Sequence, residues 1–401
     1  PRGGKSAYHK KGIPLIRSLN IYDLNFSYDD LAFIDETQAE QLANVMVEKD
    51  DVLLNITGAS VCRCTSVPDN LVPARVNQHV SIIRADKKNL LGIYLKYALV
   101  SPSYKQILYG LATTGATREA LTKIDIENFE IKLPNIVVQT RIVSVLSAYD
   151  DLIENNEKRI KALEEMAQLL YKEWFVKFKF PGHEEVKMND SGTEYRVVPD
   201  GWEIKKLAEV ASLVRGCSYS SEEIDDFIGD YYIVNLKSFN RGGGFRFDGA
   251  KYYSGSINSE QSLKTGDIVV AVTDMTNDRA VIARPARVPE ITGKITFSAD
   301  VVKINSTILP SSFIYELLST YKFTETTKQK ANGANVLHLK PTAILEFLAL
   351  IPDQKTLKNF DLLCAPVEKE IDKLIKQNDN LSKTRDLLIP QLVTGRRELK
   401  Q

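Results

Sequence analysis

The feature that most constrains this chain is an internal repeat. Residues 115–126 are matched in pattern by residues 333–344, and further upstream residues 51–57 are matched by residues 267–273. Each copy then reaches an apolar residue followed by proline and enters a long helical pattern. A repeat of this length predicts one globular unit followed by one helix, used twice, with a pseudo-twofold relation between the copies.

The two copies differ at their beginnings. Residues 198–213 precede Arg215 in the second copy, whereas the first copy opens directly at Arg2. From the register of the repeat we expect roughly fifteen or more further residues before Pro1 in a complete first unit.

Composition favours an intracellular protein of several parts. A chain of 401 residues is long enough for two or three domains. No apolar run approaches the roughly 20 residues that cross a bilayer, and no signal peptide is visible, so we expect a cytoplasmic protein without a membrane span. The four cysteines form no CxxC pair and do not match the four histidines in spacing, so we expect reduced, buried thiols and no metal site.

The charge is balanced overall but not locally. The formal net charge is zero, yet the basic residues before Asn20 meet no acidic residue until Asp23. A duplex contact can be local, so this basic arm is a candidate phosphate contact and the remaining surface suits protein partners.

The two long helical patterns carry apolar residues at heptad spacing. The predicted seam consists of Ile142, Leu146, Tyr149, Ile153, Ile160, Leu163 and Leu170 in the first pattern and Phe360, Val367, Leu374, Leu381 and Leu388 in the second. Such a seam favours a coiled coil over a surface helix, and each helix leaves its unit in the same way, so we expect an antiparallel pair. Asn156 shares the seam phase, either to set the register or at a solvated or partner-binding position. We expect Pro366 to interrupt the second helix and Pro390 to end it.

Between these patterns the sequence predicts mixed helix and sheet. Short β-branched runs indicate strands, and two longer periodic stretches indicate helices. The expected strands are 52–56, 80–83, 233–236, 268–272 and 301–304, and the expected helices are 91–108 and 311–330. Residues 177–193 contain proline, glycine and clustered polar residues and are the best candidate linker.

The helical segments also carry a family resemblance. Residues 139–156 and 163–175 look like the central conserved region of the DNA-specificity subunits of Type I restriction-modification enzymes, and residues 387–395 are similar to their C-terminal signature. The order of parts is similar over essentially the whole chain. It departs at residues 335–338, where Asn-Val-Leu-His replaces the threonine-containing loop pattern of the first copy.

The resemblance implies an α+β architecture in which two mixed α/β target recognition domains are separated by a long antiparallel two-helix coiled coil. The expected parts are an N-terminally incomplete first target recognition domain (1–134), a central conserved helix (135–180), a linker with the second target recognition domain (181–352) and a C-terminal conserved helix (353–401). Each domain would read one half of a split DNA target with a fixed spacer.

The resemblance also implies a non-catalytic subunit. Its expected partners are double-stranded DNA, two methyltransferase (modification) subunits and restriction motor-nuclease subunits. S-adenosylmethionine, ATP and magnesium would serve those partners, with no cofactor in this chain. The sequence contains no Asn-Pro-Pro-aromatic motif and no P-loop, and the glycines at 242–244 indicate a turn. The alternatives are a DNA-binding or coiled-coil scaffold protein outside a restriction system and, with less support, a catalytic DNA enzyme.

Candidate DNA contacts are polar side chains with paired donors or acceptors, in the basic arm and in loops that follow predicted strands. For each one the alternative is a solvated or turn-capping residue. In the first unit they are Lys5, Tyr8, Lys10, Lys11, Thr57, Ser60, Arg63, Asn77, Gln78, His79, Thr114, Thr117 and Arg118. In the second unit they are Arg215, Ser218, Tyr219, Asn240, Arg241, Arg246, Thr273, Asp274, Asn277, Arg279, Asn332 and Asn335.

Overall fold

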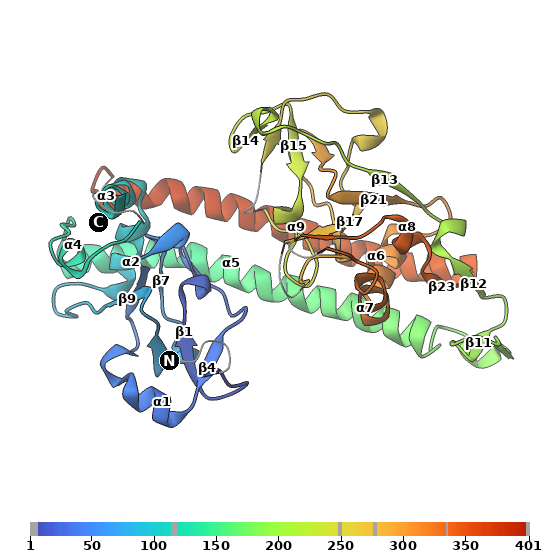
Figure 1. Cartoon of the computed structure of the whole chain (residues 1–401), viewed down its shortest axis with the longest axis horizontal. Helices are drawn as coiled ribbons and strands as arrows, with labels where there is room; N and C mark the ends of the chain where they lie inside the picture. Colours follow the sequence, from blue (N-terminus) through green and yellow to red (C-terminus); the bar gives the residue numbers. More distant parts are fainter. Residues whose placement is uncertain (1–6, 114–118, 248–250, 276–278, 334–335, 398–401) are drawn as a thin grey trace. The chain divides into compact units, whose positions relative to one another are not determined.

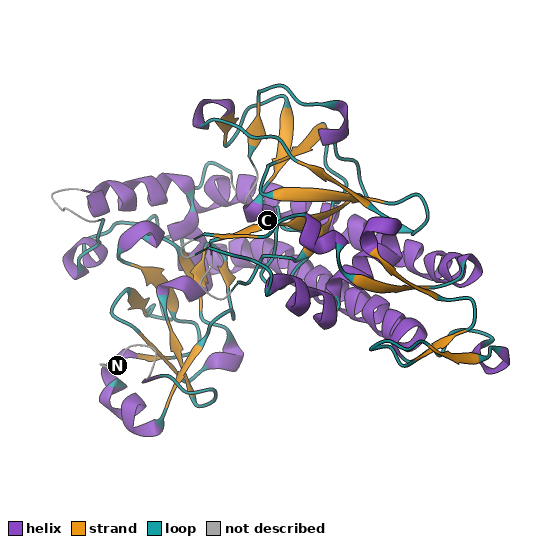
Figure 2. Ribbon diagram, turned by 45° about the vertical axis from the view of Figure 1, so that its right-hand side comes forward, coloured by secondary structure: helices purple, strands orange, loops and turns teal. Residues whose placement is uncertain are grey.

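The structure, a computed structural model of the chain, describes residues 7–113, 119–247, 251–275, 279–333 and 336–397. The chain divides into two compact units, one made of residues 1–153 with 380–401 and the other of residues 154–379. Two long helices, α5 (Ile136–Tyr171) and α9 (Gln354–Val393), contribute a stretch to each unit (Figure 1). Both units mix helices with sheets (Figure 2), as the sequence predicts.

The first unit contains a four-stranded sheet of order β4-β1-β8-β5, a three-stranded sheet of order β7-β6-β9 and the β2-β3 pair. Its strands are β1 (Ile13–Ile16), β2 (Ile21–Tyr22), β3 (Asn25–Phe26), β4 (Ala32–Ile34), β5 (Met46–Val47), β6 (Val52–Asn55), β7 (Cys64–Ser66), β8 (Ala74–Val76) and β9 (Val80–Ile83). Its shorter helices are α1 (Glu36–Gln41), α2 (Gly92–Val100), α3 (Pro102–Thr113) and α4 (Lys123–Glu127). Every residue of β6 is buried, and apolar clusters pack on both of its faces, because successive side chains alternate between faces.

The second unit contains sheets of order β13-β21-β17-β19 and β14-β16-β15-β20, and the pairs β12-β23, β18-β22 and β10-β11. Its strands are β10 (Met188–Asp190), β11 (Val197–Pro199), β12 (Glu203–Lys206), β13 (Ser212–Arg215), β14 (Ile224–Asp225), β15 (Tyr231–Val234), β16 (Tyr252–Tyr253), β17 (Ile268–Ala271), β18 (Thr273–Asp274), β19 (Pro285–Arg287), β20 (Lys294–Phe297), β21 (Val301–Asn305), β22 (Leu337–His338) and β23 (Leu348–Ile351). Its shorter helices are α6 (Ser311–Ser319), α7 (Tyr321–Lys328) and α8 (Thr342–Leu345). Like β6, β17 is buried throughout.

The two units share a pattern of strand pairing. In the first, β6 lies between antiparallel neighbours β7 and β9, and β1 pairs with the parallel strand β8 and the antiparallel strand β4. In the second, β17 lies between antiparallel neighbours β19 and β21, and β15 pairs with the parallel strand β20 and the antiparallel strand β16. A pair of short helices follows in each unit. The central strands β6 and β17 are the segments that match in sequence.

The long helices pair within each unit. In the first unit, Ile142 and Leu146 of α5 pack in one cluster with Ile389 and Leu392 of α9. In the second unit, the Asn156 Nδ2 donates to Asn378 Oδ1 at 2.9 Å, and Arg159 bonds Glu370 at 3.0 Å. Residue numbers rise on one helix as they fall on the other, so the paired stretches are antiparallel.

The predicted seam residues all lie in the interior or at its margin. Ile142, Leu146, Phe360 and Leu374 are buried, and the other eight seam residues are half-buried. Asn156 is 8% exposed and paired with Asn378, so it is not a solvated helix end.

The two proline predictions for α9 are wrong. The helix continues through Pro366 and through Pro390, and it ends at Val393. An interior proline removes one helical hydrogen bond at a cost of about 3 kcal/mol, and Phe360 and Cys364, buried against the second unit's core, offset it at Pro366. Pro390 lies in the last turn of α9, where few helical hydrogen bonds remain to be disrupted.

Three element boundaries differ from the sequence prediction. The expected helix 91–108 is two helices, because Pro102 forces Ser101 into an extended conformation. The expected helix 311–330 is broken at Thr320, whose hydroxyl caps α7 by accepting from Phe323 N. The expected strand 233–236 lies two residues earlier, at β15.

The expected linker at 177–193 carries structure of its own. Phe180 is buried beside Trp202, with ring centroids 5.1 Å apart, and β10 pairs with β11. Aromatic burial therefore overrides the glycine and polar signals of this segment.

Within the described residues, no helix is both long and apolar enough to cross a membrane.

Candidate nucleic-acid interface

The first unit has a surface depression where β6 ends. The depression measures about 450 Å³ and is lined by Ser18, Leu19, Tyr22, Thr57, Gly58, Ala59, Ser60, Arg63 and His79. Most of these residues belong to the loop that joins β6 to β7. Backbone hydrogen bonds fasten both ends of the loop: Ile56 N donates to His79 O, and Asn55 N donates to Arg63 O. Gly58 supplies the positive φ of +74° that the turn requires.

Polar contacts fix the side chains around the depression. Thr57 Oγ1 and His79 Nδ1 form a hydrogen bond of 2.7 Å, and the guanidinium of Arg63 lies 4.8 Å from the ring centroid of Tyr22. Beneath the loop, the fully buried Asn55 donates from Nδ2 to Ser60 Oγ at 3.1 Å and to Ser18 O at 2.9 Å. The wall is therefore built on a buried amide and presents hydroxyl, imidazole and guanidinium groups at the surface.

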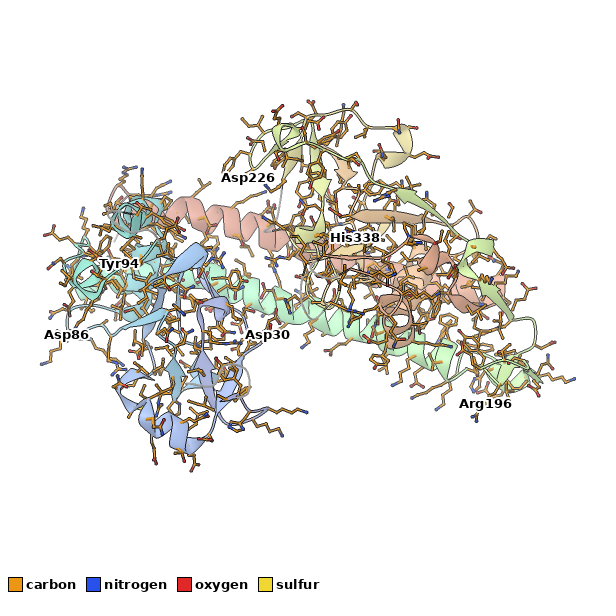
Figure 3. The ribbon with its side chains drawn as sticks, in the orientation of Figure 1. Asp30, Asp86, Tyr94, Arg196, Asp226 and His338 are labelled. Carbon is orange, nitrogen blue, oxygen red and sulfur yellow. The ribbon has the colours of Figure 1, made fainter. Side chains whose placement is uncertain are left out.

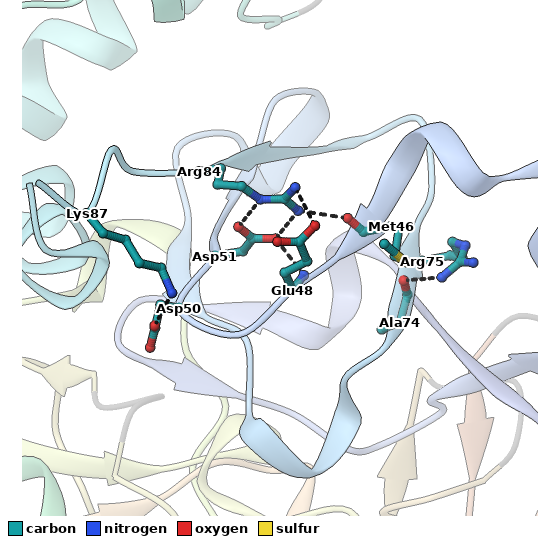
Figure 4. Close-up of polar contacts among 8 residues, drawn as sticks. All are labelled: Met46, Glu48, Asp50, Asp51, Ala74, Arg75, Arg84 and Lys87. Atoms are coloured by element: carbon teal, nitrogen blue, oxygen red, sulfur yellow. Dashed lines mark hydrogen bonds and ion pairs between the residues drawn. The ribbon is translucent and has the colours of Figure 1, made fainter.

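The opposite end of β6 is braced by an ion-pair cluster (Figure 4). Arg84, which follows β9, donates to both carboxylate oxygens of Asp51 at 2.8 and 2.7 Å and to Glu48 at 2.7 Å. Asp51 is 1% exposed, and this bidentate contact ties β6 to β9. Arg75 donates to the carbonyls of Ala39 and Ala74. The guanidinium groups of both arginines are thus used within the unit.

In the second unit the residues after β17 form a smaller polar group. Thr273 Oγ1 lies 3.4 Å from Nδ1 of the exposed His338, which is labelled in Figure 3. Asn332 exchanges two backbone hydrogen bonds with His338. As Thr57 does with His79, Thr273 places its hydroxyl beside an imidazole. The histidine comes from a different part of the chain in each unit.

Most of the first unit falls within a match to a known domain family. Residues 9–165 match the family model described as Type I restriction modification DNA specificity domain. The chain is therefore similar to Type I specificity subunits. The match covers the loop after β6, His79 and all of α5 up to residue 165.

Individual relatives extend the similarity along the chain. The chain is 28% identical over 320 residues to the Type I restriction enzyme MjaIX specificity subunit of Methanocaldococcus jannaschii, which covers 77% of this chain and 70% of the relative. It is 23% identical over 378 residues to the MjaVIII specificity subunit of the same organism. This alignment covers 89% of this chain and 81% of the relative. A crystal structure of a Type-I restriction-modification system S subunit from M. genitalium aligns with a TM-score of 0.48 and 14% identity, covering 99% of this chain and 92% of that one.

The matched region brings together part of the set of candidate DNA contacts. Thr57, Ser60, Arg63 and His79 line one depression. Beside them, Asn77 Oδ1 accepts from His79 N at 3.2 Å, and the exposed Gln78 approaches His79 Nε2 at 3.5 Å.

The described residues of the basic arm are not among those that line the depression. Lys10 and Lys11 are exposed ahead of β1, and the ring of Tyr8 lies under the guanidinium of Arg17 at 5.2 Å. The candidates Lys5, Thr114, Thr117 and Arg118 lie outside the described residues.

The second-unit candidates are more dispersed. Arg215 is exposed at the end of β13, and its Nε donates to Ala299 O at 3.2 Å. Ser218 and Tyr219 are exposed after that strand. Asn240, Arg241 and Arg246 lie on the glycine turn at 240–246, which forms as expected. Arg279 is half-buried, with Nη1 3.5 Å from Lys328 O. Asn277 and Asn335 lie outside the described residues.

Asp274 has a structural contact. It is 1% exposed, and its Oδ2 accepts from Val281 N at 2.7 Å and from Ile282 N at 2.9 Å. A carboxylate enclosed in this way holds the backbone of Val281 and Ile282 and does not present an acceptor at the surface. Its proposed contact with DNA stays a prediction that this geometry does not favour.

Among the lining residues that sequence reasoning missed, Tyr22 and Ser18 lie far in sequence from the loop after β6. Tyr22 lies in the β2-β3 hairpin, far in sequence from the loop it adjoins, and Ser18 contributes through a 3-10 turn. No motif marks either residue, and only the packing of that hairpin against β6 and β7 brings them to the depression. In the second unit, the sequence marks His338 only by its place in the loop that departs from the threonine-containing pattern of the first copy.

The four cysteines are free and buried, as expected. Burial raises the pKa of the Cys62 thiol to about 11, since a thiolate is poorly solvated there. The thiols are therefore held protonated at neutral pH and contribute to packing.

Proposed function

We propose that the chain is the DNA-specificity subunit of a Type I restriction-modification complex and that the first unit reads one half of a split duplex target. The observation that carries this proposal is that the matched specificity domain is the unit that gathers Thr57, Ser60, Arg63 and His79 around one depression. These groups offer donors and acceptors of the kind that read base edges.

The second unit is the reader of the other half-site. Its support is the shared strand pairing: β17 lies in the same arrangement as β6, and the second residue after each strand is a threonine beside a histidine. The two units are then two copies of one target recognition domain, which differ in the side chains that their loops present.

The long helices act as the spacer. The heptad seam and the antiparallel contacts within each unit support a two-helix coiled coil. In this proposal α5 and α9 set the number of unread base pairs between the half-sites and provide the surface on which two modification subunits assemble.

The chain itself is proposed to be non-catalytic. Methylation with S-adenosylmethionine belongs to the modification subunits, and cleavage with ATP and magnesium belongs to the restriction subunits. What the chain supplies is the position of those subunits on cytoplasmic DNA. The lack of methyltransferase and P-loop motifs in the sequence supports this division.

The test is a map of methylated adenines in cells that express the chain with its modification subunits. We expect one bipartite motif with a constant unread spacer, absent from cells without the chain. Replacing residues 135–352, from one apolar-proline junction to the other, with those of a relative should change one half-site and leave the other intact. A map without a bipartite motif, or a replacement that changes both halves together, contradicts the proposal.

A further inference from the structure

Arg63 differs from the other residues of the depression in its charge. Among the nine described residues that line it, Arg63 carries the single permanent charge. Its guanidinium lies over the Tyr22 ring at 4.8 Å, and in the part of the chain that the structure describes no group accepts a hydrogen bond from it. Its donors are therefore available at a surface where its plane is already supported.

Other arginines of the same unit are engaged. Arg84 is bidentate to Asp51, Arg75 donates to two backbone carbonyls and Arg17 donates to Asp30 O. A guanidinium whose donors are spent on the protein cannot also recognise a base without breaking those contacts. Arg63 has no such contact to break.

We infer that Arg63 selects a guanine in the half-site read by the first unit and that Tyr22 is the positioning residue that holds its guanidinium. This inference rests on the proposed function. Guanine presents two acceptors, O6 and N7, on its major-groove edge, and an arginine fork donates to both at once. No other base offers that pair of acceptors, so a fork held in place discriminates among bases.

The stacking on Tyr22 provides the pre-organisation. An unsupported arginine side chain gives up rotamer freedom when it binds, whereas a guanidinium held on an aromatic face has lost part of that freedom already. The loop beneath is equally well held, because buried Asn55 donates to Ser60 and to Ser18 O. The fork therefore meets the base edge from a fixed position.

The experiment selects bound sequences from a pool of duplexes with a randomised centre, using the full chain in complex with its modification subunits. For the unaltered chain we expect a guanine at one position of one half-site, preferred over other bases by about 5- to 150-fold. Arg63→Lys keeps the charge but loses the fork, so we expect the guanine preference to fall to about threefold or less while the rest of the motif remains.

A second readout removes a single atom. Replacing that guanine with 7-deazaguanine takes away N7, so binding by the unaltered chain should weaken several-fold and binding by Arg63→Lys should change little. The matched control is Lys49→Ala, which removes a positive charge at the opposite end of β6 where Lys49 pairs with Asp69. It should leave the base preference unchanged.

The positioning role of Tyr22 is tested separately. Tyr22→Ala should reduce the guanine preference, and Tyr22→Phe, which retains the aromatic face, should restore most of it. A general folding defect would instead weaken recognition of every position in both half-sites.

The outcomes separate the inference from the proposed function. A bipartite motif that Arg63→Lys leaves unchanged, or a guanine for which 7-deazaguanine makes no difference, overturns the role of Arg63. A failure of the unaltered complex to select any motif overturns the proposed function itself.

Discussion

At the residue scale, the second unit contains a buried carboxyl group whose charged form is destabilised by its surroundings. Glu316 on α6 is 5% exposed, and its Oε2 has no hydrogen-bond partner among the described residues. Glu368 on α9 and Glu164 on α5 add negative charge beside it, with Arg287 acting on Glu368. Burial first, and then Glu368 and Glu164, raise the pKa of Glu316 to about 8.

This raised pKa predicts a specific dependence of stability on pH. Between about pH 4.5 and 8 the unfolded chain releases a proton that the folded chain retains, so stability falls as the pH rises through that window. Glu316→Gln removes the titration. We expect it to stabilise the protein by on the order of 1–3 kcal/mol at pH 8 and to have little effect at pH 5.

Thermal unfolding midpoints at the two pH values measure this effect. The control is Glu260→Gln, an exposed position in the same unit that should leave both midpoints unchanged. An equal shift for Glu316→Gln at pH 5 and pH 8 would show that the carboxyl does not titrate in this window.

At the element scale, one aspartate joins three helices of the first unit. Asp150 on α5 accepts from Lys96 Nζ at 3.1 Å and Tyr97 OH at 2.6 Å on α2, and from Arg385 Nη1 at 2.8 Å on α9. Burial raises the pKa of Asp150, but Lys96, Tyr97 and Arg385 together outweigh it, so the pKa is lowered. The carboxylate therefore stabilises the packing of α2, α5 and α9 in its charged form.

Asp150→Ala should destabilise the first unit by about 3 kcal/mol, because it leaves Lys96 and Arg385 without their buried partner. Urea unfolding and hydrogen exchange across residues 380–393 measure the loss. The exposed neighbour Asp151→Ala is the matched control and should change stability by less than about 0.5 kcal/mol.

Since the folded pKa is lowered, the contribution of Asp150 should disappear as the pH falls below about 4. Equal effects of the two substitutions would remove Asp150 from this role.

At the scale of the whole molecule, the proposed function assigns the helix pair the role of holding the two units at a fixed separation. Both α5 and α9 have residues in each unit, and no other described helix does. If these helices set the spacer, a change in helix length must change the DNA target without changing either half-site.

Four residues inserted between Glu157 and Ala167 lengthen α5 by about 6 Å and rotate it only modestly, because four residues are close to one turn. DNA rises about 3.4 Å per base pair, so we expect one or two additional unread base pairs between unchanged half-sites. Adenine-methylation mapping of the insertion variant reads out the spacer. Charged substitutions at Leu163 or Leu381 serve as the comparison, since they loosen the seam and should lower methylation at every target. An active insertion variant with its original spacer would assign the distance to another part of the complex.

The sequence by itself determined the periodic and repeated features. The buried runs at β6 and β17, the heptad seam of α5 and α9 and the turn at 240–246 follow from patterns within a few residues of one another. The family resemblance likewise followed from contiguous helix motifs. Local patterns of this kind are legible because each residue's neighbours in sequence are also its neighbours in space.

The tertiary structure alone decided which distant residues meet. It set Tyr22 under Arg63, placed the Asp274 carboxylate against the amides of Val281 and Ile282, and continued α9 through Pro366. In each case the decisive energy comes from contacts between segments far apart in the chain: the hairpin packing beside β6, the loop amides around a carboxylate and the apolar core around Phe360. No local pattern encodes those contacts, so burial and pairing, rather than propensity, determined which polar groups remain at the surface.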